Sequence, residues 1–263
     1  MNIQPYFEQQ GSGPPIVFIH GSFASYNTWK KYCEQLSNKY LCISIKLPGH
    51  GGAPPLANSN PADISGETAL IKQIVTSLSD QPAHIVGHSY GAVVALALAL
   101  ENTLALSKLS LFEPVSGWLL QYQQRTQAEL TILNQFVADY KLTIAQQQPQ
   151  ACAKVIDFWG GENSYASLPE FIQNSMPPLT QLNIKHWQQC MALSYNLRDL
   201  SQLNIATQVI YGDQSNPILK TIAQLITEHT PHSQIHCIAG ASHFLVNSHS
   251  DACINILQQP INS

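Results

Sequence analysis

One short turn constrains the fold of this chain more than any other feature: Gly87–Gly91, which contains a serine between two glycines. The residues before it, Ala83–Val86, are mostly apolar or β-branched and predict a buried strand. The residues after it, Ala92–Leu100, contain no proline or glycine and are rich in helix formers. In a strand, tight turn and helix of this kind, the glycines allow close backbone approach, and the hydroxyl of Ser89 projects above the sheet.

The same alternation of strands and helices continues on both sides of this turn. It predicts an α/β fold with a mostly parallel central sheet that is covered by helices on both faces. The other expected strands are 15–20, 40–45, 109–112, 208–212 and 234–238, and the other expected helices are 28–36, 62–79, 216–228 and 251–258.

The middle of the chain has a different pattern. Residues 114–200 show helical periodicity, expected over 119–140, 151–159 and 184–195, without a strand signal. We therefore predict an α/β core made of residues 1–113 and 201–263, with an all-helical cap, or lid, inserted at 114–200. Such an insertion would lie over the carboxyl ends of the strands, where open α/β sheets bind ligands.

Composition excludes several classes of function. Of 263 residues only 11% are charged, the net charge is −4, and no basic stripe suggests a nucleic-acid partner. The six cysteines form no C-x-x-C pair, which argues against a zinc site or a redox dithiol. We expect neither a metal nor a cofactor. The longest apolar run is too short to span a bilayer, and the first residues lack a signal-peptide pattern. A cytoplasmic protein is the expectation, and the sequence does not indicate its oligomeric state.

A serine hydroxyl is a poor nucleophile unless it has a base, an orienter for that base and donors for the developing oxyanion. His243 follows the last expected strand and is the candidate general base for Ser89. The backbone N–H of Tyr90, directly after the serine, is one candidate oxyanion donor. Ser22, in the loop after the first expected strand, supplies the second, with Phe23 as the adjacent alternative. His20 is expected to brace that loop rather than act as a base.

Five motifs, in the order in which they occur along the chain, resemble those of the α/β-hydrolase superfamily, and the resemblance covers nearly the whole chain. The resemblance implies the inserted lid, an acyl transfer from an ester-like substrate to Ser89, and hydrolysis by water. Since the nucleophile is serine rather than aspartate, it also argues against the epoxide hydrolase and dehalogenase branches. The motifs are His20-Gly21, Pro48–Gly51, Gly87–Gly91, Gly212-Asp213 and Gly240-x-x-His243.

Two positions depart from the pattern that the resemblance implies. Lys46 stands where an acidic residue commonly precedes the Leu-Pro-Gly-His-Gly turn. Ser215 stands where the acid that orients the histidine is commonly found. Two carboxylates compete for that role: Asp213 lies in the usual loop at a different offset, and Glu113 lies at the family's second location. We favour Glu113 and keep Asp213 as the alternative.

The expected function is hydrolysis of a small or medium, neutral and largely apolar carboxylic ester or thioester. Lactone, C–C and amide bonds remain open because they use the same machinery. Candidate pocket walls are Tyr90, Phe23, Trp118 and Trp159. The alternative is a protein of the same fold that binds a small ligand or a partner with little or no turnover, which the displaced acid favours.

Overall fold

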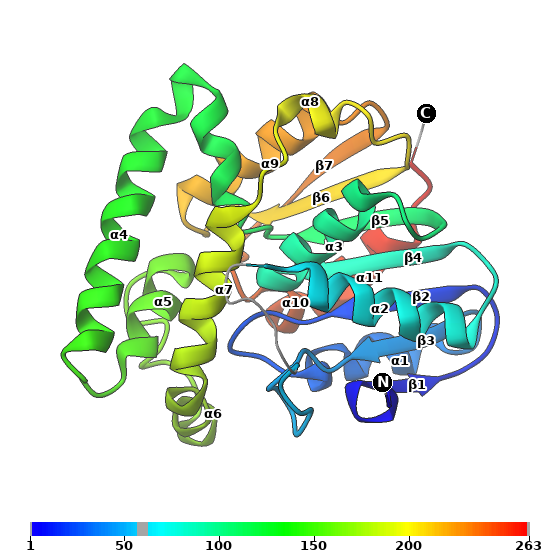
Figure 1. Cartoon of the computed structure of the whole chain (residues 1–263), viewed down its shortest axis with the longest axis horizontal. Coiled ribbons are helices and arrows are strands. Elements are labelled where there is room, and N and C mark those ends of the chain that lie inside the picture. Colours follow the sequence, from blue (N-terminus) through cyan, green and yellow to red (C-terminus); the bar gives the residue numbers. More distant parts are fainter. Residues whose placement is uncertain (1, 57–62, 262–263) are drawn as a thin grey trace.

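The centre of the molecule is a seven-stranded sheet in the order β1-β3-β2-β4-β5-β6-β7 (Figure 1). The computed structural model describes residues 2–56 and 63–261. The edge strand β1 runs antiparallel to β3, and every other neighbouring pair is parallel, which confirms the mostly parallel sheet. The strands are β1 (Phe7–Gln10), β2 (Pro15–Ile19), β3 (Leu41–Ile45), β4 (Ala83–His88), β5 (Leu106–Phe112), β6 (Thr207–Gly212) and β7 (Ser233–Ile238).

Alternate residues of the central strands enter two separate hydrophobic cores. In β2, Val17 and Ile19 belong to one core, while Ile16 and Phe18 belong to the other. This division follows from the period-2 alternation of side chains along a strand. Both faces of the sheet are therefore buried, which explains why β2 is a continuous apolar run.

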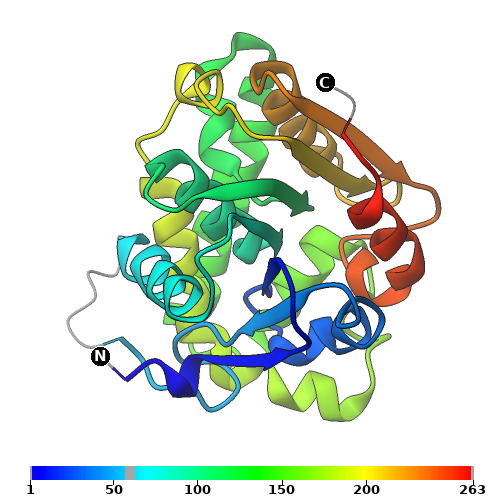
Figure 2. The same ribbon diagram turned by 90° about the vertical axis from the view of Figure 1, so that its right-hand side faces the viewer.

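Helices cover both faces (Figure 2). Side chains of α2, α3 and α9 pack into the first core, and those of α1, α10 and α11 pack into the second. The helix expected from Ala62 begins in the described chain at Ser65, and Ala62 lies outside the described residues. The bounds are α1 (Lys30–Leu36), α2 (Ser65–Leu78), α3 (Tyr90–Glu101), α9 (Pro217–His229), α10 (Leu245–Ser248) and α11 (Ser250–Gln258), with 3-10 turns η1 (Gln4–Tyr6) and η2 (Tyr26–Trp29).

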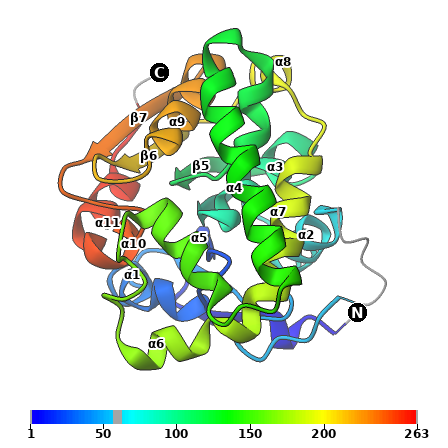
Figure 3. The ribbon, with the colours of Figure 1, turned by 90° about the vertical axis from the view of Figure 1, so that its left-hand side faces the viewer.

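Between β5 and β6 the described chain is helical. Helices α4 to α7 stand together at one end of the sheet (Figures 1 and 3). Helix α8 packs instead against α9. The elements are η3 (Gly117–Tyr122), η4 (Gln124–Thr126), α4 (Gln127–Ala145), α5 (Ala151–Gly160), α6 (Glu170–Ser175), η5 (Pro177–Leu179), α7 (Thr180–Ala192) and α8 (Leu197–Leu200).

Two expected helices have different bounds in the structure, and one strand was not expected. The single helix expected over 119–140 is interrupted, because the Thr126 hydroxyl donates to the carbonyls of Leu120 and Gln123 and closes a separate turn before α4. The helix expected over 184–195 begins earlier and ends earlier, as α7. Strand β1 had no sequence signal, since Phe7 is its only apolar residue.

Candidate active site

The turn around Ser89 is held by close backbone packing. Ser89 lies between β4 and α3 with φ 56° and ψ −120°, a conformation that non-glycine residues rarely adopt. A Cβ on Gly87 would lie 2.6 Å from the Cα of Ala92, and one on Gly91 would lie 2.5 Å from the carbonyl oxygen of His20. Both positions therefore require glycine, and the turn presents the serine side chain at the carboxyl end of β4.

A chain of hydrogen bonds joins Ser89, His243 and Glu113. His243 Nε2 lies 3.0 Å from Ser89 Oγ, and His243 Nδ1 lies 3.0 Å from Glu113 Oε2. The other carboxylate oxygen of Glu113, Oε1, accepts from the Gly212 N–H at 2.6 Å and from the Ser215 hydroxyl at 2.9 Å. Because a carboxylate only accepts, His243 Nδ1 carries the hydrogen, and Nε2 is left free to accept from the serine.

The two candidate carboxylates have different surroundings. Glu113 follows β5, has no exposed surface, and has a positive φ of 49°. Asp213 is exposed, and its Oδ1 accepts from the Gly240 N–H at 2.7 Å. The structure therefore brings Glu113 to His243, whereas Asp213 braces the loop that leads toward His243.

The candidate oxyanion donors Tyr90 and Ser22 line the same pocket as Ser89. Tyr90 is the first residue of α3, so its N–H has no acceptor within the helix. The carbonyl of Ser22 accepts from His50 Nε2 at 2.7 Å. The hydroxyl of Ser22 contacts Asn183 and His186 of α7.

Three other histidines, in β4 or directly after β2, are structural and neutral. His20 donates from Nδ1 to the Gly21 carbonyl at 2.7 Å and accepts the Leu47 N–H at Nε2, which braces the loop as expected. His88 Nε2 donates to the carbonyl of His243 at 2.8 Å, and His84 bonds within the core. Burial lowers the pKa of His20, His84 and His88 to about 3 in each case, so none carries a charge at neutral pH.

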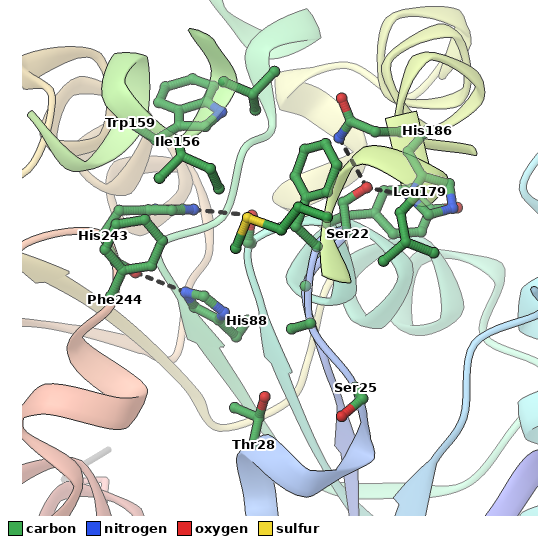
Figure 4. A pocket seen from close by; sticks show the side chains of 18 of the residues that line it. Ser22, Ser25, Thr28, His88, Ile156, Trp159, Leu179, His186, His243 and Phe244 are labelled. Carbon is green, nitrogen blue, oxygen red and sulfur yellow. Dashed lines mark hydrogen bonds between the residues drawn. The ribbon is translucent and has the colours of Figure 1, made fainter. Parts of the chain in front are cut away.

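A cavity of about 890 Å³ opens onto Ser89 between the sheet and helices α5 to α7 (Figure 4). Of the expected wall residues, Phe23, Tyr90 and Trp159 line it. The ring centroids of Trp159, in α5, and His243 are 5.9 Å apart. The expectation that Trp118 lines the cavity is wrong. Trp118 is fully buried, its indole N–H donates to the Tyr195 carbonyl, and it lies outside the cavity wall.

The described part of the cavity wall contains histidines but no other ionisable side chain of strong acid or base character. Among the described residues that line it there is no Lys, Arg, Asp or Glu. No group of three His, Cys, Asp or Glu side chains in the described ranges is arranged to hold a metal ion. No helix within those ranges is long and apolar enough to cross a membrane.

Lys46, the residue in place of the usual acid, has a structural role. Its ammonium group forms an ion pair with Glu8 of β1 at 2.6 Å and lies 4.7 Å from the centre of the Tyr26 ring. These contacts connect the edge strand β1 to η2. They do not involve the hydrogen-bonded residues Ser89, His243 and Glu113.

The chain matches a family model over most of its length. A model described as "Alpha/beta hydrolase family" matches residues 16–256. The chain belongs to the alpha/beta hydrolase family. Solved structures agree on the fold: MenH from S. aureus superposes with a TM-score of 0.77 and 19% identity over 96% of each chain.

Curated relatives match over a smaller share of the chain. A pimeloyl acyl-carrier-protein methyl ester esterase of Methylococcus capsulatus is 34% identical over 43% of this chain and 44% of its own length. Monoacylglycerol lipase ABHD6 of Homo sapiens is 23% identical over 90% of this chain and 72% of its own length. The match thus spans less than half of the first of these relatives.

Sequence reasoning missed three residues of α7 that reach the site: Asn183, His186 and Gln189. Their spacing of three places them on one face of a helix. Polar residues at this spacing usually face solvent, so the pattern alone gave no signal for a buried contact.

Proposed function

We propose that this protein is a serine hydrolase of uncharged carboxylic esters or thioesters, with Ser89 as nucleophile. The observation that carries the proposal is the buried chain from Glu113 through His243 to Ser89, which ends at a cavity whose described wall contains no Lys, Arg, Asp or Glu. Ser89 Oγ attacks the carbonyl carbon of the substrate while its proton passes to His243 Nε2. The carboxylate of Glu113 stabilises the imidazolium that forms, through the hydrogen on Nδ1.

The oxyanion of the tetrahedral intermediate accepts hydrogen bonds from the backbone N–H groups of Tyr90 and Ser22. As this intermediate collapses, His243 gives its proton to the leaving alcohol or thiol, and the acyl group remains on Ser89. A water molecule then attacks the acyl carbon while His243 again takes a proton. Collapse of the second intermediate releases the acid and restores the hydroxyl of Ser89.

We further propose that residues 114–200 act as the lid of this site. Trp159 of α5 lies over the imidazole, and exclusion of water there strengthens the hydrogen bonds to charged intermediates. Figure 4 places Ile156 and Trp159 on one side of His243 and the hydroxyls of Ser25 and Thr28 on the other. This arrangement favours an apolar acyl group on the lid side and a more polar leaving group on the opposite side.

A non-catalytic binding protein is the second candidate, which the serine at position 215 favoured. The contact between Glu113 and His243 weakens that candidate, because it supplies the carboxylate that Ser215 lacks. Labelling with a fluorophosphonate separates the two functions, since the reagent reacts only with an activated serine.

The test combines that label with a matched pair of esters. We expect the protein to be labelled and to hydrolyse p-nitrophenyl butyrate. The p-nitrophenyl half-ester of succinate has an acyl chain of the same length with a carboxylate at its end. Because burial of an unpaired carboxylate costs several kcal/mol, its kcat/KM is expected to be lower by about 100-fold or more.

Ser89→Ala should abolish both labelling and turnover. Ser116→Ala is the matched control, because Ser116 is also a buried serine but lies outside the cavity wall. It should retain both. A wild-type protein that is folded but neither labelled nor active would contradict the proposed function, and equal rates on the two esters would contradict the neutral substrate.

A further inference from the structure

Helix α7 directs three buried polar side chains at the two candidate oxyanion residues. Asn183, His186 and Gln189 have exposed fractions of 3%, 3% and 0%. Asn183 Nδ2 donates to the hydroxyl of Ser22 at 2.9 Å, and His186 Nδ1 lies 2.5 Å from the same oxygen. Figure 4 shows His186 beside Ser22. With the carbonyl of Ser22 bonded to His50, this residue is held at both its hydroxyl and its backbone.

The same face of α7 also holds Tyr90. The His186 ring stacks on the Tyr90 ring, with centroids 3.7 Å apart and planes 3° from parallel. The Tyr90 hydroxyl donates to Gln189 Oε1 at 2.8 Å. Gln189 Nε2 in turn donates to Glu67 Oε1 at 3.1 Å, which anchors this contact to α2 of the core.

Burial lowers the pKa of His186 well below its ordinary value, so the ring is neutral. A neutral ring with its hydrogen on Nε2 leaves Nδ1 free to accept from the Ser22 hydroxyl. That hydroxyl then accepts from Asn183 and donates to His186, which uses its hydrogen and one lone pair. The contact is therefore directional and would be lost if α7 moved away.

We infer that Asn183, His186 and Gln189 are positioning residues, through which α7 holds the backbone N–H groups of Ser22 and Tyr90 in the geometry of the oxyanion hole. The inference rests on the proposed function. Asn183 and His186 also line the cavity, so the seating of a substrate against α7 and the stabilisation of its oxyanion are coupled.

Ser22→Ala is the sharpest test, because it removes both contacts to α7 and leaves the backbone N–H of residue 22 in place. His186→Phe keeps a ring for stacking and removes the acceptor. Because a small misplacement of an oxyanion donor acts only in the transition state, kcat is expected to fall about 10-fold to 100-fold with KM within about threefold. The affinity for a trifluoromethyl ketone, which mimics the tetrahedral intermediate, should fall by the same factor as kcat/KM.

The double variant should be no slower than the slower single variant, because both changes break the same contact between Ser22 and His186. Thr143→Val is the matched control: Thr143 is a buried threonine of α4 that bonds within its own helix, and its loss should leave kcat and ketone affinity unchanged. Ser22→Ala deletes a single oxygen, so it remains informative if His186→Phe folds poorly.

Two results would overturn the inference in distinguishable ways. If the wild type hydrolyses the ester and both variants keep its kcat and ketone affinity, the positioning role is wrong and the proposed function stands. If the wild type is neither active nor labelled, the proposed function fails and the inference fails with it.

Discussion

Replacing Glu113 by glutamine changes which nitrogen of His243 carries the hydrogen. Glu113 Oε1 accepts from the Gly212 N–H and the Ser215 hydroxyl, so the amide oxygen of a glutamine is required at that position. The amide NH₂ then faces His243 Nδ1, 3.0 Å away in the wild type, where the carboxylate accepted a hydrogen. The ring must place its hydrogen on Nε2 to accept this new donor, and Nε2 can no longer take the proton of Ser89.

The expected loss follows from this change of tautomer. A carboxylate-to-amide exchange in a serine triad costs about 10⁴-fold in kcat, equivalent to about 5.5 kcal/mol of transition-state stabilisation. For Glu113→Gln we expect kcat/KM to fall by about 10³-fold to 10⁴-fold, since the neighbouring donors fix the amide orientation. The value of kcat/KM is measured by following the hydrolysis of p-nitrophenyl butyrate, and the rate of fluorophosphonate labelling is a second readout.

Asp213→Asn is the matched control, because it makes the same chemical change at the competing carboxylate. An asparagine Oδ1 can still accept the Gly240 N–H, so we expect kcat/KM to stay within about threefold. Thermal unfolding of both variants excludes loss of fold as the cause. A larger loss in Asp213→Asn than in Glu113→Gln would refute the assignment of the acid.

Three further predictions follow from the same structure. His84→Asn should flatten the rise of unfolding free energy with pH. The pKa of His84 is about 3 in the fold and 6.5 in the unfolded chain, so the unfolded chain binds the extra proton and stability is lost as pH falls below 6.5. Urea titrations at pH 5 and 7 should show that the unfolding free energy of the variant changes by up to about 1.4 kcal/mol less per pH unit than that of the wild type. Gly91→Ala should prevent accumulation of folded protein, because its Cβ would lie 2.5 Å from the carbonyl oxygen of His20; a normal unfolding midpoint would contradict this. Ser215→Asp should raise kcat/KM at least about 10-fold when it is added to Glu113→Gln. In the wild type the same change should lower kcat/KM, since two carboxylates then compete for one site. Additive effects among the wild type, the two single variants and the double variant would argue against this coupling.

The sequence predicted those parts of the molecule that depend on local pattern. The strands β2 and β4 are apolar runs bounded by turn residues, and the turn at Ser89 lies between such a strand and a helix, so fold and turn were accessible. Strand β1 was not, because Phe7–Gln10 is recognised only by its pairing with β3, more than thirty residues away. The pattern of the strand itself gives no indication of that partner.

The α7 contacts were inaccessible for a related reason. Asn183 and His186 look like residues of a solvated helix face, and only the placement of α7 against Ser22 makes them part of the site. Trp118 shows the opposite error: an aromatic residue at the start of the insertion was expected in the cavity wall, but its indole is buried against the Tyr195 carbonyl. Both outcomes depend on how the helices between β5 and β6 pack on the sheet, which periodicity does not specify.

The contact between Ser215 and Glu113 bears on the departure from the family pattern at position 215. Ser215, at the usual position of the acid, donates its hydroxyl to Glu113 Oε1 at 2.9 Å. An aspartate at that position would place a second carboxylate within hydrogen-bond distance of the first, and two like charges in a buried site disfavour each other. We therefore expect carboxylates at the two positions to disfavour each other, and a serine at 215 fits the proposal that Glu113 is the acid.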